Sequence, residues 1–404
     1  MRILHVYRTY FPDTQGGLEE VIRQICLNSL DHGVESRVFA LTQTHDPEVV
    51  DQPEAQVHRA KQHAEIASCG LSFKAGNRFR ELVDWADVVH YHFPWPFADF
   101  LHIYHSVQKP CIVTYHSDIV RQRLLGKLYR PLMNRLLSSV DRIVCTSPNY
   151  FATSNVLQRF SDKVEVIPIG LNQDSYPNPN ADQLAAVEKD YGRAFFLFVG
   201  VLRYYKGLHI LLEAIENSSI QVVIAGSGPT ERELRAQAES LGLKNVTFAG
   251  SVDEVTKVCL FELSVGIVFP SYLRSEAFGV TLLEGAMFGK PLISAEVGSG
   301  TSHVNVDGKT GYVVAPGSAA DLRKAMEKIV ANPKIAAHLG AQAKQRYKAL
   351  FTGRLMGARY TSLYQNVLGN EETATQPTVQ LPTSVTPKPE LLEPTITTAI
   401  RKRS

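Results

Sequence analysis

The chain has 404 residues, of which 44% are hydrophobic and 20% charged, with a formal net charge of +2. A single hydrophobic core stops growing at roughly 250 to 300 residues, so the length predicts two domains. The nearly neutral charge argues against a nucleic acid partner, and no apolar run reaches the ~18 residues that a membrane-spanning helix needs.

The N-terminal segment MRILHVYRTYFP and the five cysteines indicate the compartment. His5 and Arg8 interrupt the apolar start, which favours a first strand over a signal peptide. The cysteines are scattered, odd in number and without a CxxC pair, which favours free thiols over disulfides or a zinc site. We therefore expect a cytoplasmic protein, with peripheral association at the inner face of the cytoplasmic membrane as a further expectation.

Apolar strands alternate with helical patterns along most of the chain. Stretches such as 17–33 and 206–217 place leucine, isoleucine and valine at helical spacing. Apolar strands separated by amphipathic helices predict an α/β fold, with parallel sheets covered by helices on both faces. The expected strands are 2–7, 35–41, 86–92, 110–116, 141–147, 163–169, 195–201, 220–226, 245–250, 263–270, 290–296 and 311–315.

The domain boundary is predicted in VIPIGLNQDSYPNPN, where proline and asparagine accumulate after the sixth strand. Residues 1–172 and 173–368 would each form a doubly wound, Rossmann-like domain. The last helix of the second domain would pack back on the first domain. Residues 369–404 would form a tail. Its composition, rich in threonine and proline from Thr373 onward, predicts disorder.

Ligands of parallel sheets bind at the loops that follow the strands, and two such loops in the first half carry suitable residues. Gly16 and Gly17 in TYFPDTQGGLEE would let the backbone approach a ligand and leave free amides at a helix start, although a tight turn is the alternative. His116 in TYHSD follows a strand. It would either hydrogen-bond a ligand hydroxyl or serve as a buried structural residue.

Further loops lie in the second half. Arg203 and Lys206 in VGVLRYYKGLHILL stand between a strand and a helix start, so two cations and the helix dipole would converge on an anion such as a diphosphate. Plain surface cations are the alternative. Gly226 follows the strand in IAGSGPTE, which lacks the third glycine of a dinucleotide fingerprint, and Val252 in AGSVDEV would lie against a base.

The stretch SEAFGVTLLEGA contains two glutamates eight positions apart. Glu276 would lie ahead of a helix, Phe278 and Gly279 at its start, and Glu284 inside it. Carboxylates accept hydrogen bonds from vicinal diols of a ribose or hexose, and the amides near Gly279 would face an anion. The pair therefore fits a sugar nucleotide, whereas a helix cap and a solvent-facing glutamate form the alternative.

Over roughly residues 1–368 these motifs resemble the retaining glycosyltransferases of family four, and in particular bacterial mannosyltransferases of surface-polysaccharide assembly. The most specific element is the Glu-x7-Glu pattern of Glu276 and Glu284. The resemblance implies a GT-B fold, in which two Rossmann-like domains face each other across a cleft. It also implies that the first domain binds the acceptor, with Gly16 and Gly17 on that side, and that the second binds the sugar nucleotide.

The resemblance also implies the roles of single residues. As catalytic residues, His116 would bind a hydroxyl of the donor sugar, Lys206 the diphosphate and Glu276 the transferred sugar. Glu284 would bind the nucleotide ribose. The chain departs from the family at Val201, where an arginine is usual, and Arg203 follows two positions later. The implied donor-binding set is Gly17, Arg203, Lys206, Gly226, Val252, Glu276, Phe278, Gly279 and Glu284.

No metal or other cofactor is expected. No two aspartates stand two positions apart, so the Asp-x-Asp site of many transferases is missing from the sequence. Lys206 and helix amides would then neutralise the departing diphosphate. The resemblance further implies attack by the acceptor on the face that the diphosphate leaves, so that no protein nucleophile is needed.

We therefore expect a retaining hexosyltransferase that transfers mannose from GDP-mannose to a glycan or lipid-linked acceptor in polysaccharide or lipopolysaccharide synthesis. A UDP-sugar donor and a sugar-nucleotide-binding protein without activity are the alternatives. A nicotinamide-dependent oxidoreductase would need G-x-G-x-x-G after the first strand, which YFPDTQGGLEE lacks. Residues 119–135 interleave five cations with leucines, which predicts contact with an anionic membrane surface, or else an ordinary domain helix.

Overall fold

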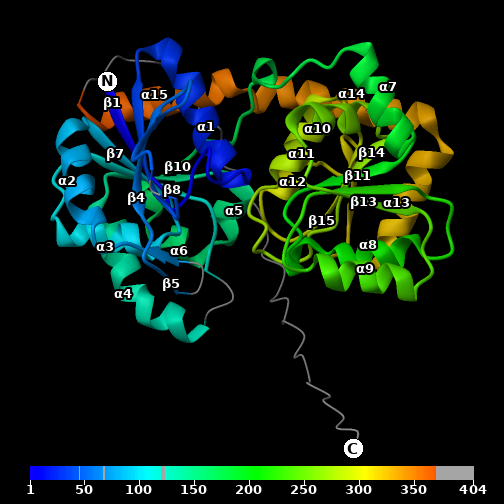
Figure 1. Cartoon of the computed structure of the whole chain (residues 1–404), viewed down its shortest axis with the longest axis horizontal. Coiled ribbons are helices and arrows are strands. Elements are labelled where there is room, and N and C mark those ends of the chain that lie inside the picture. Colours follow the sequence, from blue (N-terminus) through cyan, green and yellow to red (C-terminus); the bar gives the residue numbers. More distant parts are fainter. Residues whose placement is uncertain (45, 67–68, 120–122, 370–404) are drawn as a thin grey trace, which may run out of the picture. The chain divides into compact units, whose positions relative to one another are not determined.

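The computed structural model describes residues 1–44, 46–66, 69–119 and 123–369, and Figure 1 shows its helices and strands. The predicted disorder of the tail falls outside the described residues from position 370 onward. Arg121 also lies outside them, as do the side chains at positions 123–125 and 127.

The first half of the chain forms an eight-stranded sheet in the order β10-β9-β8-β7-β1-β2-β4-β3. All its neighbouring strands are parallel except β3, which runs antiparallel to β4. A separate antiparallel pair joins β5 and β6. The bounds are β1 Arg2–Val6, β2 Glu35–Thr42, β3 Val49–Asp51, β4 Gln56–Lys61, β5 Ala64–Ile66, β6 Cys69–Leu71, β7 Val88–Phe93, β8 Cys111–Tyr115, β9 Arg142–Cys145 and β10 Val164–Val166.

All six strands predicted for the first half are confirmed, but β3, β4, β5 and β6 were not predicted. β4 was missed because its sequence QVHRAK is polar. In the structure Arg59 of this strand is buried, and its charge is paired with Asp13 at 2.8 Å. A strand that contains such a buried ion pair is not recognised when only apolar residues are counted.

Helices cover both faces of the first sheet. One face packs against α2, α3 and α4 through residues such as Phe79, Leu101 and Leu136. The other packs against α1 and α15 through residues such as Val21 and Tyr360. The bounds are α1 Gly17–Ser29, η1 Leu30–His32, α2 Ala75–Trp85, α3 Pro96–Tyr104, α4 Arg123–Ser139, α5 Pro148–Thr153, α6 Asn155–Gln158 and η2 Ser161–Lys163.

The second half forms a six-stranded parallel sheet in the order β13-β12-β11-β14-β15-β16, which is the doubly wound Rossmann order. All six predicted strands are confirmed. The bounds are β11 Phe196–Val199, β12 Val222–Ala225, β13 Val246–Gly250, β14 Gly266–Phe269, β15 Leu292–Ala295 and β16 Gly311–Val314.

The helices of the second half lie on both faces of this sheet. Figure 1 shows α8 and α9 on one side of it and α10 and α11 on the other. The bounds are η3 Gln173–Ser175, α7 Ala181–Tyr191, η4 Tyr204–Lys206, α8 Leu208–Ile215, α9 Glu231–Ser240, α10 Glu254–Leu263, α11 Val280–Met287, α12 Thr301–Val304, α13 Ala319–Ala331, α14 Pro333–Leu350 and α15 Gly353–Val367.

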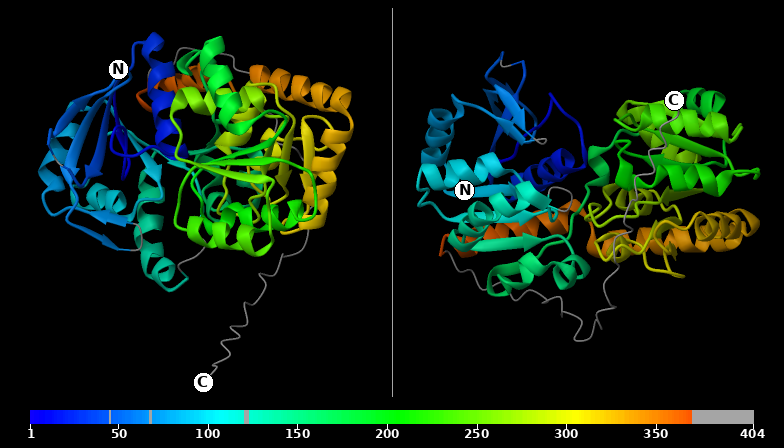
Figure 2. Two further views of the ribbon diagram at one scale, coloured as in Figure 1. Left: turned by 45° about the vertical axis from the view of Figure 1, so that its right-hand side comes forward. Right: turned by 90° about the horizontal axis from the view of Figure 1, so that it is seen from below.

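The last described helix, α15, packs against α1, the first helix of the chain. Figure 2 shows the two helices, orange-red and blue, close together. At Gly357 of α15, a Cβ atom would lie 2.1 Å from the carbonyl oxygen of Asn28 in α1. The Tyr364 hydroxyl contacts His90 Nδ1 in the first sheet at 2.9 Å. Residues from the end of the second half therefore complete the core of the first sheet.

Among the described residues, no helix has the length and apolarity needed to cross a bilayer.

Candidate functional site

The strand order of the second sheet reverses between β11 and β14, and such a switch point leaves a crevice in which ligands bind. The loop after β11 carries Arg203 and Lys206, and the loop after β14 leads to Glu276. The backbone N–H of Tyr272 donates to the carbonyl oxygen of Tyr205 at 3.1 Å and so joins the two loops. The cations and the first glutamate selected from the sequence therefore flank one switch point.

Lys206 and Glu276 form an ion pair at this point. The Lys206 ammonium lies 2.5 Å from Glu276 Oε2, which also accepts a hydrogen bond from Ser271 Oγ at 3.1 Å. The two side chains are only 13% and 11% exposed, and the ammonium lies 4.6 Å from the centroid of the Phe269 ring. A cation and a carboxylate held side by side can together bind a phosphate and a hydroxyl group.

Glu284 lies in the second turn of α11, whose N-cap is Gly279. The backbone of Gly279 has φ of +88°, a left-handed conformation that favours glycine and turns the chain sharply into the helix. Glu284 is buried, and its Oε1 accepts hydrogen bonds from Tyr176 and Lys257, both at 3.1 Å. Lys257 also contacts Glu254 at 2.8 Å. Burial lowers the pKa of Lys257, but the two carboxylates outweigh this effect and raise it overall.

Lys257 and Tyr176 were not predicted from the sequence as site residues. Lys257 stands in the first turn of α10, where the helix dipole disfavours a cation. This unfavourable position is a signal that a nearby carboxylate or ligand holds the lysine there. Tyr176 has no such signal, since only the fold brings it to Glu284.

Three of the predicted donor-binding residues have packing roles in the structure. A Cβ atom on Gly226 would lie 2.1 Å from the carbonyl oxygen of Gly200, so the close approach of two backbones requires glycine. The Phe278 ring is buried edge-on against Phe351, which limits a ligand contact to its backbone. Val252 lies partly buried against the hydrophobic core. Donor contacts of these residues stay predictions.

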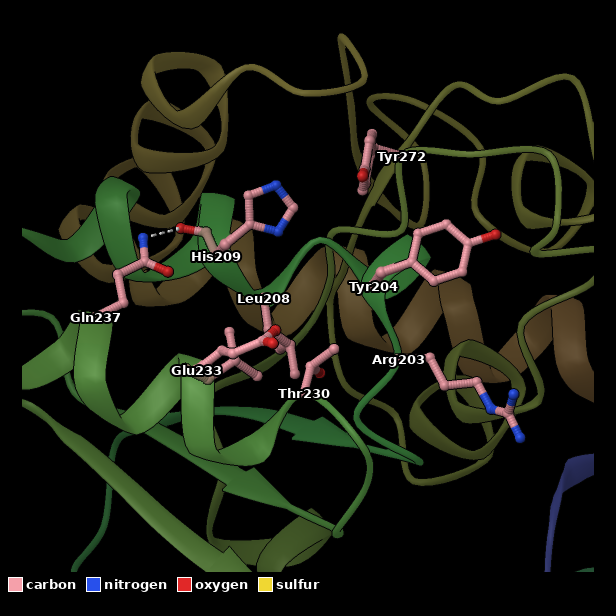
Figure 3. A pocket seen from close by; sticks show the side chains of 9 residues that line it. Arg203, Tyr204, Leu208, His209, Thr230, Glu233, Gln237 and Tyr272 are labelled. Carbon is pink, nitrogen blue, oxygen red and sulfur yellow. Dashed lines mark hydrogen bonds between the residues drawn. The ribbon is translucent and has the colours of Figure 1, made fainter. Parts of the chain in front are cut away.

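A cavity of about 150 Å³ adjoins the loop after β11. Arg203 lies on its rim, with the guanidinium pointing away from the cavity centre (Figure 3). Inside, the Gln237 side chain donates to the carbonyl oxygen of His209 at 3.0 Å, and the His209 ring packs edge-on against Tyr272. The donor contact of Arg203 stays a prediction. The lining residues are Arg203, Tyr204, Leu208, His209, Thr230, Glu233, Leu234, Gln237 and Tyr272.

The strand order of the first sheet reverses between β1 and β7, and the glycine pair follows β1. Gly17 is the first residue of α1, and a Cβ atom on it would lie 3.8 Å from the Val280 side chain at the start of α11. A Cβ atom on Gly16 would lie 2.6 Å from the Glu19 carboxylate. The structure thus brings Gly17 next to the segment that begins with Gly279.

His116 follows β8 and is buried at 3% exposure. Its Nε2 lies 3.1 Å from His92 Nδ1, and His92 Nε2 lies 3.1 Å from His5 Nδ1. Burial lowers the pKa of His5 and of His116 to about 3, so both rings are neutral at pH 7. The sequence analysis considered only His116. The alternation of His90 and His92 in one strand was the available signal for a shared face.

His5, His90 and His92 are spaced so that a nitrogen of each lies within 4.8 Å of the others, a distance that could suit a metal ion. Both ring nitrogens of His90 have other partners, however: Thr114 at 2.7 Å and Tyr364 at 2.9 Å. Both nitrogens of His92 contact neighbouring histidines. A metal would have to displace these hydrogen bonds, so the geometry favours a hydrogen-bonded network.

Arg274 was also not predicted from the sequence as a site residue. It lies between β14 and Glu276, and its Nε donates to Asp118 at 3.2 Å. The Arg274 guanidinium also donates to the carbonyl oxygen of Gly298 at 2.9 Å and lies 4.5 Å from the centroid of the Tyr150 ring. Asp118 is two residues beyond His116, so this ion pair links the loop of Glu276 to the loop of His116.

Comparisons with known proteins match both halves. Residues 15–175 match the model of Glycosyltransferase Family 4, and residues 180–346 match that of Glycosyl transferases group 1. D-rhamnosyltransferase WbpZ of Pseudomonas aeruginosa is 53% identical over 352 residues, which are 87% of this chain and 92% of that protein. O-antigen chain mannosyltransferase C of Escherichia coli is 46% identical over 368 residues, which are 91% of this chain and 99% of that protein.

Solved structures show the same fold. Sucrose-phosphate synthase from Thermosynechococcus elongatus superposes with a TM-score of 0.75 at 21% identity, covering 92% of this chain and 100% of that one. Anabaena HepE in complex with UDP and glucose gives a TM-score of 0.71 at 16% identity, covering 89% and 98%. With two relatives matched over nearly their whole length and both halves assigned, the chain belongs to the GT-B glycosyltransferases, as its motifs predicted.

Proposed function

We propose that this glycosyltransferase is a retaining enzyme that transfers mannose from GDP-mannose to a glycan or lipid-linked glycan of a bacterial surface polysaccharide. The observation that carries the proposal is the Lys206–Glu276 ion pair at the switch point of the second sheet, with Glu284 eight residues further on. The name of the E. coli relative, an O-antigen chain mannosyltransferase at 46% identity, supports the choice of sugar and pathway class.

In this proposal the charges of the second sheet bind the leaving group. The Lys206 ammonium and the backbone amides at the start of α11 stabilise the negative charge that develops on the diphosphate. Glu276, held by Ser271, accepts hydrogen bonds from hydroxyls of the transferred sugar. Glu284 accepts them from the ribose, and Tyr176 and Lys257 hold its carboxylate in place. The acceptor attacks the face that the diphosphate leaves, without a protein nucleophile.

D-rhamnose is a second candidate for the transferred sugar, because the relative at 53% identity is a D-rhamnosyltransferase. D-rhamnose is 6-deoxymannose, so the two sugars differ only in the hydroxyl at carbon 6. Turnover of the two GDP-sugars with one acceptor distinguishes the candidates. Faster transfer of D-rhamnose would replace mannose in the proposal and leave the proposed leaving-group chemistry intact.

The nucleotide is tested by the melting temperature of the full chain with GDP, UDP and ADP, each in large excess. A ligand at 100 times its Kd stabilises the folded state by about 2.7 kcal/mol, so the preferred nucleotide raises the melting temperature most. We expect GDP to be preferred. A shift with UDP alone would instead favour the UDP-sugar alternative. Transfer to an acceptor, rather than nucleotide binding by itself, separates an enzyme from a binding protein.

We also propose that catalysis needs no divalent metal, because Lys206 and helix amides supply the charge that an Asp-x-Asp-bound ion supplies elsewhere. The expected result is that EDTA changes the rate of sugar transfer less than twofold. A parallel assay with added magnesium or manganese serves as the control. Complete loss with EDTA that either ion restores would show that the diphosphate is neutralised by a bound metal.

The proposed acceptor places the enzyme at the inner face of the cytoplasmic membrane, through the segment 119–135. In its described part, Leu128, Arg130 and Arg135 are exposed, whereas Leu136 and Leu137 just beyond it are buried. The buried leucines show that the end of α4 belongs to the core. Within the segment Met133 is also buried, so the proposed membrane contact is confined to the exposed side chains of the helix.

A further inference from the structure

Four histidines lie on one face of the first sheet, and strand register explains why. In the parallel pair of β1 and β7, His5 is the partner of His90. In the pair of β7 and β8, His92 is the partner of Thr114, and His116 follows Thr114 by two positions. Because alternate residues of a strand face the same side, these side chains share the face that α15 covers.

Three of the histidines form a continuous hydrogen-bonded chain. His5 Nδ1 contacts His92 Nε2, and His92 Nδ1 contacts His116 Nε2, both at 3.1 Å. Burial lowers the pKa of all three rings, so each carries a single ring proton at neutral pH. Each bond needs one donor and one acceptor nitrogen. The three protons must therefore all point along the chain in the same direction, and no ring can change its tautomer alone.

The His5 end of the hydrogen-bonded chain indicates the direction in which the rings donate. His5 Nε2 is buried and has no hydrogen-bond partner among the described residues. If the donors pointed from His116 toward His5, this atom would be a buried N–H without an acceptor, which is rarer in proteins than an underused acceptor. If the donors point from His5 toward His116, His5 Nε2 carries only a lone pair. His5 and His92 then donate from Nδ1, and His116 keeps its proton on Nδ1.

We propose that His5 and His92 are positioning residues, which hold the His116 ring in one orientation with its proton on Nδ1. His116 then offers a fixed N–H donor to a hydroxyl of the donor sugar. This inference rests on the role proposed for His116 in donor binding. His90 stands outside the chain, because its nitrogens contact Thr114 and Tyr364.

The tautomers can be read directly by NMR on the full-length protein with ¹⁵N-labelled histidine, without any substrate. We expect long-range ¹H–¹⁵N correlations to place the proton of His5, His92 and His116 on Nδ1, with assignment by single variants. A proton on Nε2 of His116, or an averaged signal, would overturn the proposal. So would one equivalent of bound zinc or nickel in the purified protein together with loss of these N–H signals.

A matched pair of substitutions tests the consequence for catalysis. His92→Asn places an amide nitrogen near the position of Nδ1 and can still donate to His116, whereas His92→Gln places its amide near Nε2 and can reach only His5. We expect His92→Gln to lower kcat/KM for the donor about 10-fold or more, and His92→Asn to lower it less than about 3-fold. Melting temperatures of both variants check that they fold alike.

The pair also separates this inference from the proposed function. In His92→Gln the His116 tautomer should become averaged, and in His92→Asn it should stay on Nδ1. Equal losses of activity in the two variants, or an unchanged His116 tautomer in His92→Gln, would refute positioning by His92. If instead His116→Ala has full activity while the wild-type tautomers are as expected, the donor contact assigned to His116 is wrong and the hydrogen-bonded chain remains.

Discussion

The two sheets carry different kinds of side chain at equivalent places. In both, the strand order reverses, between β1 and β7 in the first sheet and between β11 and β14 in the second. The second sheet has the charged pair Lys206–Glu276 there, and Lys257 and Glu284 form a further pair on α10 and α11. The first gathers neutral histidines. Strand order thus determines where these residues gather, and in the proposed function the charged residues bind the diphosphate whereas the neutral histidines orient a sugar hydroxyl.

The largest expected effect comes from removing charged side chains of the second half. We expect Lys206→Ala and Glu284→Ala each to lower kcat/KM at least 100-fold, because a desolvated diphosphate or ribose loses a charge-assisted partner worth roughly 2 to 4 kcal/mol. Lys309→Ala, which removes an exposed cation of the same half, is the matched control. Near-normal activity of either site variant, with a normal melting temperature, would refute its assignment.

Acid should destabilise the buried histidines of the first sheet. The folded pKa of His5 and His116, about 3, lies below the unfolded value near 6.5, so the unfolded state binds more protons between these limits. The stabilisation that comes from keeping these rings neutral is therefore complete above pH 6.5 and is lost as the pH falls. At pH 5 the free energy of unfolding should be lower by about 2 kcal/mol for each of the two rings.

Denaturant unfolding at pH 7 and pH 5 measures this difference. His5→Asn removes one of these buried rings, so the loss between the two pH values should be smaller in this variant than in the wild type. An equal change in the free energy of unfolding in the wild type and in His5→Asn would show that the His5 ring accepts a proton in the folded state. It would contradict the neutral character assigned to the first sheet.

The smallest expected effect concerns α4, which lies beside the first sheet. We expect salt-sensitive binding of the wild type to vesicles with anionic lipid, and weaker binding of Arg130→Ser and Arg135→Ser, since each cation near the surface contributes about 1 kcal/mol. Arg232→Ser, which changes an exposed cation on α9, is the control. Failure of the wild type to sediment with such vesicles at low salt would leave α4 as an ordinary surface helix.

The sequence predicted most of the fold because the strands of both sheets are continuous apolar segments. It missed β4, because the charge of Arg59 is balanced by a residue 46 positions away. It also predicted that Lys206 and Glu276 would flank one site, because the loops of a doubly wound sheet meet at known places, and the structure pairs the two side chains. Tyr176 and Arg274 were not found, since their partners are fixed by tertiary contacts, whereas Lys257 and His92 carried weak local signals.

Packing also decided what several predicted site residues do. Gly226 is required by a neighbouring backbone, and the Phe278 side chain belongs to the core. A motif search cannot separate such residues from ligand-binding ones, because the same turn must be both compact and open to a ligand. The structure separates them by showing where each side chain lies.

The packing of α15 against α1 has a consequence for biosynthesis. The first sheet presents one of its faces to residues 353–367, which are synthesised after every strand of both sheets. Until then the nascent first half exposes the apolar surface that Tyr360 and Tyr364 later cover, and such surfaces bind chaperones or aggregate. The core of the first sheet is thus complete only after residues 353–367 have been made.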